Sequence, residues 1–187
     1  QSKKGATMKI NNVEKAMEGR SDGSTAKKLM ELADKDPVHH IELELTNALE
    51  RAYEEAKEGF EEGGCPIGSV LERAGKVVAQ GRNQRVQKGD PIAHGEMDAL
   101  RKAGRQSTYR DTTLYTSLSP CMMCTGTIIQ FGIPRVVIGE AVNFGGNEEL
   151  LRSRGVEVII ANDQDCINLM TKFIEEKPEL WAEDIAE

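Results

Sequence analysis

Two short motifs must meet in space if this chain is to build a single reactive centre, and that requirement constrains its fold more than any other feature. The first motif is Ala93-His94-Gly95-Glu96-Met97, and the second is Ser119-Pro120-Cys121-Met122-Met123-Cys124. Together they supply one imidazole, two thiolates and one carboxylate. Because imidazole and thiolate are preferred ligands of zinc, the motifs predict a zinc site held by His94, Cys121 and Cys124.

Three protein ligands indicate a catalytic zinc site, because a structural site is closed by four. The remaining position then holds water, whose pKa zinc lowers to roughly 7. Glu96 follows His94 closely and is suited to take a proton from that water and deliver it to a substrate. His-x-Glu followed by Pro-Cys-x-x-Cys is the signature of zinc-dependent nucleobase deaminases, in which hydroxide attacks a ring carbon and ammonia leaves.

Two other interpretations of the cysteine motif stay open at this point. A purely structural zinc site needs a fourth ligand, and the remaining thiols, Cys65 and Cys166, have no motif spacing to the others. A redox-active dithiol leaves the His-x-Glu motif unexplained. Both interpretations explain fewer of the residues than an open zinc site does.

Hydrophobic periodicity predicts an α/β protein. A long amphipathic helix over 41–62 precedes two strands, 67–71 and 77–80, which a turn at Arg73-Ala74-Gly75 joins. A polar loop over 81–92 comes next. Further helices are predicted over 94–103, 121–131, 147–154, 163–176 and 178–185, with strands over 112–117, 135–139 and 156–161. This order predicts a three-layer α/β/α sandwich around a mixed sheet of about five strands.

The N-terminal part of the chain is the least informative. Residues 1–40 are predicted to be a polar extension and 41–187 a deaminase domain, with no linker to a second one. Residues 1–7, ahead of Met8, are interpreted as an artificial leader. A short helix is expected over 24–33. His39-His40 is expected to be a solvated pair before the long helix.

Composition narrows the classes of partner. The net charge is −7 and the pI is about 5.2, which argues against a polynucleotide substrate, because proteins that grip nucleic acid present a basic face. No apolar run approaches the roughly 20 residues of a membrane helix. With four cysteines, two of them in the metal motif, a reducing cytoplasm is the expected location.

With these motifs in place, the chain resembles the cytidine deaminase-like superfamily and, within it, the fungal-type cytosine deaminases. The closer resemblance is carried by Pro66-Ile67-Gly68, Gly81-Arg82-Asn83, 111–126, 131–135, Val142-Asn143-Phe144 and the tail from Trp181 to Glu187. The sequence departs from the fungal pattern in its N-terminal extension and at Cys65, Val86, Met122, Ala182 and Ala186. None of these departures removes a predicted catalytic group.

The resemblance implies hydrolytic deamination of free cytosine to uracil and ammonia by a zinc-bound hydroxide, with one Zn²⁺ per chain. It also implies a cytoplasmic homodimer that serves pyrimidine salvage and needs neither nucleic acid nor a membrane. Deamination of another free heterocycle such as guanine is the alternative, and editing of adenosine in tRNA is a further one. A non-catalytic, zinc-stabilised interaction protein is the alternative from a different class.

The resemblance also implies which residues contact the base. Apolar contacts fall to Ile67, Phe144 and Trp181, and polar contacts to Asn83, Asp184, the Ser119 carbonyl and the main-chain N–H groups of Gly95 and Cys121. In this assignment Asn83 binds the ring edge, whereas Asp184 and Ser119 contact the exocyclic amine. Each side chain also has a simpler interpretation: Asn83 as a turn former, Phe144 as core, Trp181 as a dimer contact and Asp184 as a solvated charge.

Overall fold

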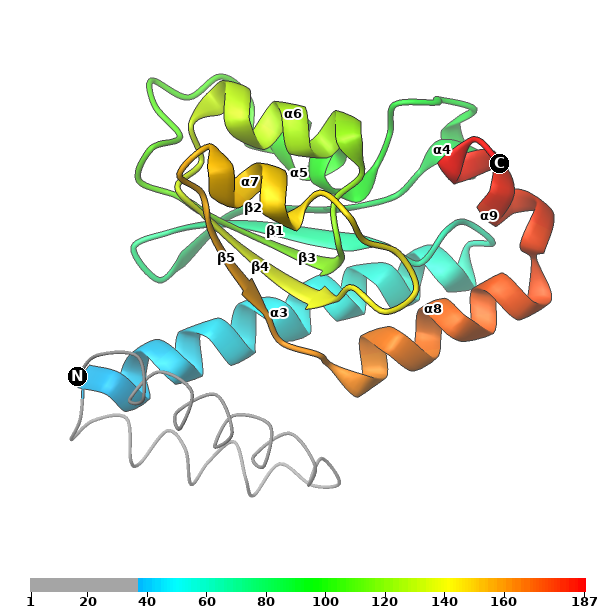
Figure 1. Cartoon of the computed structure of the whole chain (residues 1–187), viewed down its shortest axis with the longest axis horizontal. Coiled ribbons are helices and arrows are strands. Elements are labelled where there is room, and N and C mark those ends of the chain that lie inside the picture. The colour runs from blue at the N-terminus through cyan, green and yellow to red at the C-terminus, as the bar shows by residue number, and fades with distance from the viewer. Residues whose placement is uncertain (1–36) are drawn as a thin grey trace. The chain divides into compact units, whose positions relative to one another are not determined.

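A mixed five-stranded sheet lies at the centre of the fold (Figure 1). Its strands are β1 (Gly68–Arg73), β2 (Lys76–Arg82), β3 (Thr113–Leu118), β4 (Arg135–Glu140) and β5 (Glu157–Ile160), in the order β2-β1-β3-β4-β5. β1 pairs antiparallel with β2 and β3, whereas β3, β4 and β5 run parallel to one another. The predicted mixed sheet is therefore confirmed.

The computed structural model describes residues 37–187, so the helix predicted over 24–33 lies outside the described residues. The chain divides into two units, 1–47 and 48–187, and the second contains every predicted site residue. Of the first unit, the described part is the helical backbone of 37–47, the beginning of α3 (Pro37–Glu61). His39-His40 was expected to precede this helix but lies within it, because Pro37 is tolerated in a first helical turn.

Helices cover both faces of the sheet in the unit 48–187. In chain order they are α4 (Arg85–Lys88), α5 (Gly95–Ala103), α6 (Met122–Phe131), α7 (Glu148–Ser153), α8 (Gln164–Glu176) and α9 (Pro178–Ile185). Figure 1 shows α5, α6 and α7 over one face, and α8 with the second half of α3 over the other. This arrangement is the predicted three-layer sandwich.

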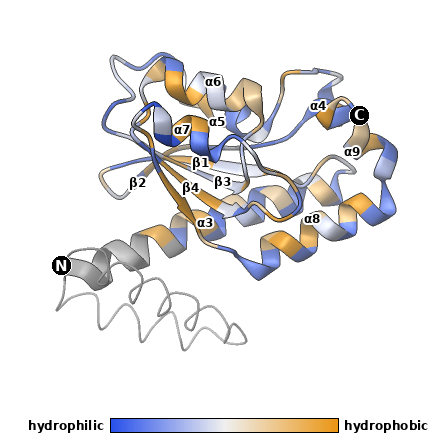
Figure 2. Cartoon of the chain, in the orientation of Figure 1, coloured by the Kyte–Doolittle hydropathy of each residue, from blue (hydrophilic) through white to orange (hydrophobic). Residues whose placement is uncertain are grey.

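Apolar side chains gather on both sides of the sheet. Figure 2 shows apolar colour along β4 and β5, and helices whose apolar and polar residues form separate stripes. One buried cluster lies beneath α5, α6 and α7 and includes Leu71, Leu114, Ile128, Val136 and Leu151. A second cluster, which includes Cys65, Ile67, Leu118, Met170, Phe173 and Trp181, joins the ends of the strands to α8 and α9. Burial of these faces drives the assembly of the layers.

The long helix approaches the sheet closely at one glycine. A Cβ atom at Gly68 would lie 2.0 Å from the Ala52 carbonyl oxygen of α3. No side chain fits in that space, so glycine at this position lets the helix lie directly on β1. Ala52 and Ala56, which are almost fully buried, form the matching surface of the helix.

Other elements also differ from those that the sequence predicts. The segment 81–92 was expected to be a loop, but β2 continues to Arg82 and Arg85–Lys88 form α4. A four-residue helix is too short to show a hydrophobic period, which explains why it was missed. In addition, His94 and Cys121 are the N-cap residues of α5 and α6, one position before the helices begin.

Candidate active site

Two neighbouring helix starts bring the predicted zinc ligands together. His94 and Cys121 both have extended backbone conformations as N-caps, and Cys124 lies in the first turn of α6. The ligand atoms of these three residues lie within 4.8 Å of one another, and His94 Nδ1 is 3.5 Å from Cys121 Sγ. Nitrogen and sulfur bound tetrahedrally to zinc at about 2.0 and 2.3 Å lie about 3.5 Å apart. The donor set and its spacing therefore fit zinc.

The ionisation of these groups suits a metal site. Hydrogen bonds with Cys124 and with His94 outweigh the effect of burial and lower the pKa of Cys121 to about 4. Burial alone would lower the pKa of His94, but the hydrogen bond to Cys121 and nearby carboxylates raise it. The hydrogen bond with Cys121, together with burial, raises the pKa of Cys124 well above its ordinary value. The protein thus stabilises one thiolate before any metal binds.

Glu96 lies beside this cluster and is only 3% exposed. The Thr116 hydroxyl donates a hydrogen bond to Glu96 Oε1 at 3.3 Å, and the Cys124 thiol lies 3.3 Å from Oε2. Burial and the Cys121 thiolate raise the pKa of the carboxyl. A buried carboxyl with a raised pKa is suited to taking and giving a proton near neutral pH.

The neighbouring glycine matters for this geometry. A Cβ atom at Gly95 would lie 2.8 Å from the Ile67 carbonyl oxygen. Glycine therefore allows the start of α5, with His94 and Glu96, to approach the chain that enters β1.

A small cavity lies over the cluster. Its walls come from Ile67, His94, Glu96, Leu118, Ser119, Cys121, Phe144, Trp181, Asp184 and Ile185. The cavity volume is about 20 Å³, which is room for about one water molecule. A heterocyclic ring can therefore enter only if a wall moves. Asn83 and Gly95 are not among the lining residues, although both lie directly behind them.

Two aromatic side chains close one wall. The rings of Phe144 and Trp181 meet edge to face, with centroids 5.8 Å apart. The loop that carries Phe144 is held by Glu140, a fully buried carboxylate that accepts hydrogen bonds from the N–H groups of Val142 and Asn143 at 2.6 and 2.9 Å. Trp181 lies in α9 and is 8% exposed. The cavity wall is thus built from a tethered loop and the last helix.

Asn83 and Asp184 meet behind the cavity, although 101 residues separate them. The Asn83 side-chain amide donates to Asp184 Oδ1 at 3.2 Å, and both side chains are almost fully buried. Asp184 Oδ1 also lies 3.6 Å from His94 Nε2. Asp184 therefore faces the metal cluster as well as the predicted base-binding amide.

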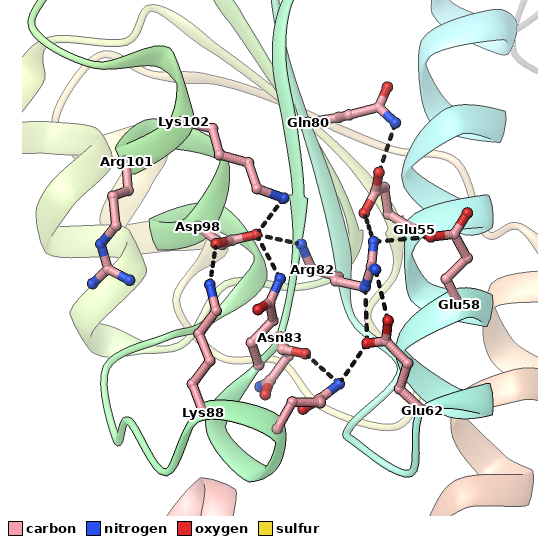
Figure 3. Close-up of polar contacts among 12 residues, drawn as sticks. Glu55, Glu58, Glu62, Gln80, Arg82, Asn83, Lys88, Asp98, Arg101 and Lys102 are labelled. Atoms are coloured by element: carbon pink, nitrogen blue, oxygen red, sulfur yellow. Dashed lines mark hydrogen bonds and ion pairs between the residues drawn. The ribbon is translucent and has the colours of Figure 1, made fainter.

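The segment that carries Asn83 is anchored on the α3 side by Arg82 (Figure 3). The Arg82 guanidinium lies 2.7 Å from Glu55, 2.9 Å from Glu58 and 2.8 Å from Glu62, three carboxylates on α3. These hydrogen bonds, with Glu62 first among them, raise the pKa of Arg82. β2 is thereby fixed to α3 one residue before Asn83.

The same segment is anchored on its other side by Asp98 of α5 (Figure 3). Asp98 Oδ2 accepts hydrogen bonds from the Arg82 N–H at 3.2 Å and the Gln84 side chain at 3.3 Å. Lys102 lies 2.8 Å from the same oxygen. The two residues that flank Asn83, Arg82 and Gln84, are thus held by α3 on one side and α5 on the other, and these contacts place Asn83.

Sequence reasoning missed several residues at the site. Arg85 contacts Asp184 at 2.8 Å, the Ser119 hydroxyl donates a hydrogen bond to the Glu148 carboxylate, and Leu118 and Ile185 line the cavity. None belongs to a motif, and most of these contacts join segments far apart in the chain. A larger hollow of about 550 Å³ lies elsewhere, over α5 and α6 near Arg105 and Phe131, away from the zinc cluster.

The fold and the site define the class of protein, an α/β domain with a His-Cys-Cys cluster suited to hold a metal ion beside a buried glutamate. Residues 44–140 match the family model described as the cytidine and deoxycytidylate deaminase zinc-binding region. The chain belongs to this family. Within the described residues 37–187, no helix has the length and apolar character needed to cross a membrane.

Several known deaminases are similar to this chain, to different degrees. The chain is 56% identical over 142 residues to the cytosine deaminase of Candida albicans, a match that covers 74% of this chain and 95% of that protein. It is 32% identical to a tRNA-specific adenosine deaminase of Streptococcus pyogenes, over 70% and 89% of the two chains. The structure of a guanine deaminase from Nitrosomonas europaea has the same fold, with a TM-score of 0.60, 21% identity, and coverage of 67% and 82%.

Proposed function

We propose that this protein is a cytosine deaminase that converts free cytosine and water to uracil and ammonia. One observation supports this reaction class: the ligand atoms of His94, Cys121 and Cys124 lie at the same cavity as buried Glu96. The 56% identity to the Candida albicans enzyme supports cytosine as the base. The buried Asp184 carboxylate in the cavity wall is suited to accept a hydrogen bond from an exocyclic amine.

In this proposal His94, Cys121 and Cys124 hold one zinc ion. When bound, zinc supplies a nucleophile at neutral pH by lowering the pKa of water. Glu96 takes the proton that the attacking water loses and gives it to the ring nitrogen beside the reacting carbon. Glu96 then takes the second proton of the same water, from the hydroxyl that becomes the uracil carbonyl, and gives it to the departing amine, which leaves as ammonia. The raised pKa of this buried carboxyl favours both transfers.

The base is held by the walls of the cavity. Phe144 and Trp181 provide apolar surface against its faces and exclude water, with Ile67 on the same wall. Asn83 binds the ring edge, Asp184 and the Ser119 carbonyl bind the amine, and the Gly95 N–H holds the oxygen that develops. Each of these polar groups would be left without a partner by a base of the wrong pattern, which is the origin of specificity.

A substrate panel with metal analysis tests the proposal. Ammonia release is measured on cytosine, cytidine, guanine, adenine and a tRNA with a wobble adenosine. We expect zinc near one equivalent per chain and turnover of cytosine in preference to the others. Turnover of guanine, or of the tRNA, with none of cytosine would refute the proposal. The net charge of −7 supports a small substrate over tRNA.

We propose further that the protein is a homodimer in a reducing cytoplasm and that it serves pyrimidine salvage. Met122 and Phe131 on α6 are 63% and 46% exposed, and such apolar exposure favours an interface. The four cysteines are free thiols, which suits a reducing compartment. We keep residues 1–40 as an extension and 41–187 as the deaminase domain. Sedimentation equilibrium would test the dimer, and a monomer at micromolar concentration would contradict it.

A further inference from the structure

Arg85 is a cation at the site that no part of the proposed chemistry uses. It is the first residue of α4, and its side chain is only 12% exposed. Its Nη1 atom donates to Asp184 Oδ1 at 2.8 Å, and Nη2 contacts Glu183 Oε1 at 3.1 Å. Its guanidinium thus ties α4 to the end of α9, across 99 residues of sequence.

The main chain of Arg85 holds the other half of the base-binding pair. Its N–H donates a hydrogen bond to the Asn83 side-chain oxygen at 3.1 Å. That bond turns the Asn83 amide nitrogen toward Asp184, to which it donates at 3.2 Å. One residue therefore orients both Asn83, through its backbone, and Asp184, through its side chain.

We propose that Arg85 is a positioning residue that sets the place of the Asp184 carboxylate relative to Asn83, and thereby selects bases that carry an exocyclic amine. This inference rests on the proposed function, since it assumes that the two side chains contact the base. Arg85 itself lines no part of the cavity and acts through Asp184.

Of the two ion pairs that Arg85 makes, the one with Asp184 is the stronger. Asp184 is 3% exposed and Arg85 12%, so the pair lies where water screens it little. Removing one member of such a pair leaves a buried charge without compensation. Glu183 is 64% exposed, and its ion pair with Arg85 adds little. Among the described residues, Asp184 Oδ1 also accepts a hydrogen bond from the Asn83 amide and lies 3.6 Å from His94 Nε2.

The contact also bears on the apolar wall. Trp181 and Asp184 lie three positions apart on α9, so they share one face of that helix. Holding Asp184 therefore also holds Trp181 over the cavity and against Phe144. A separate contact, from Lys177 to the Gly63 carbonyl at 3.1 Å, fixes the start of α9. Loss of the Arg85 side chain would free the end of the helix while its start stays attached.

The test uses Arg85→Met, which removes the guanidinium and keeps the main-chain bond to Asn83. Arg85→Lys retains the charge but lacks the two-pronged geometry. Arg135→Met is the matched control, because it removes an exposed Arg–Glu pair between β4 and β5. For each protein we would measure zinc content, KM and kcat for cytosine, and the inhibition constant of pyrimidin-2-one. That ring has hydrogen in place of the exocyclic amine, so it has nothing for Asp184 to bind.

For Arg85→Met we expect the KM for cytosine to rise at least about tenfold, as for a broken buried charge contact, while pyrimidin-2-one binding changes less than about threefold. Arg85→Lys should restore part of the difference, and Arg135→Met should behave as the unaltered protein. If binding of cytosine and of pyrimidin-2-one weakened equally, or if neither weakened, the inference would be overturned. If Arg85→Met does not fold, the same comparison in Arg85→Lys decides.

A second readout needs no substrate. Trp181 is the only tryptophan in the chain, so intrinsic fluorescence reports on this helix alone. We expect emission from Arg85→Met to shift to longer wavelength as Trp181 gains water, and that from Arg135→Met to stay unchanged. An unshifted spectrum in a folded, zinc-loaded Arg85→Met would count against the positioning role. Failure of the unaltered protein to deaminate cytosine would instead refute the proposed function.

Discussion

The proposed zinc-ligand cluster and the proposed base-binding wall are neighbours in space but are built in opposite ways. His94, Cys121 and Cys124 come from two adjacent helix starts, whose local backbone sets their direction. The wall comes from segments spread over most of the domain, from Ile67 to Asp184. The matched family model ends at residue 140, so it includes the cluster and excludes Phe144, Trp181 and Asp184.

Because the two regions are built differently, the reaction class and the choice of base depend on different parts of the sequence. A cluster held by helix starts needs only a few residues at fixed spacing, and many substrates can share it. A wall held by tertiary contacts depends on how distant segments pack, and it can change while the cluster stays the same. The reaction class therefore follows from local sequence, and the choice of base follows from long-range packing.

The largest effect is expected on the cluster side of the comparison, from Glu96→Gln. Glutamine keeps the shape of the buried side chain but cannot carry a proton. We expect kcat for cytosine to fall at least about a hundredfold, as for loss of a general acid/base, with zinc content unchanged. Steady-state kinetics and metal analysis measure both quantities.

Glu149→Gln is the matched control for this substitution. Glu149 is 85% exposed on α7, and its substitution should leave kcat unaltered. If Glu96→Gln kept full turnover with zinc bound, Glu96 would not be the proton carrier. If it lost the zinc, the residue would belong to the metal site instead.

A smaller effect is expected on the wall side, from Trp181→Ala. The indole is 8% exposed and packs edge to face against Phe144, so its removal opens the cavity to water. We expect kcat/KM to fall about tenfold to a hundredfold, mostly through KM, because ground-state contacts are lost while Glu96 and the ligands stay in place.

Sedimentation of the same variant distinguishes the two interpretations of Trp181. A wall residue leaves the oligomeric state unchanged, whereas a dimer contact alters it. A Trp181→Ala protein with normal KM and a changed oligomeric state would show that Trp181 is a dimer contact and not part of the base-binding wall.

The sequence predicted the locally encoded parts of the molecule better than the parts that depend on long-range contacts. The sheet, the main helices and the residues of the zinc cluster were accessible because their signals are local: hydrophobic period, glycine stops and motif spacing. Arg85 and Glu140 were not. A contact between positions 99 residues apart leaves no pattern in the chain, and neither does a buried carboxylate that holds a loop through its main-chain N–H groups and one side-chain amide. Asn83 and Asp184 were predicted as base contacts only through family resemblance.

The smallest effect on catalysis, but a clear one on stability, is expected from Asp98→Asn, which loosens the anchor of the Asn83 segment. Asp98 is 1% exposed and pairs with Lys102 at 2.8 Å. Burial alone would raise its pKa, but Lys102 and the Arg82 N–H lower it below the ordinary 3.8. We expect the free energy of unfolding at pH 7 to fall by about 1–3 kcal/mol, as for a buried polar group that loses a charged partner.

The lowered pKa of Asp98 sets how this loss of stability changes with pH. Because the folded protein holds the Asp98 pKa below its unfolded value, the stabilisation is fully present above about pH 5 and is lost as the pH falls through the folded pKa. Urea unfolding should therefore show a constant difference between the two proteins from pH 5 to 8 that shrinks below about pH 4. Glu175→Gln, an exposed change on α8, is the control. A difference that grew on acidification would mean that Asp98 is destabilised as a charge, and the anchor of Asn83 would then rest on Arg82 alone.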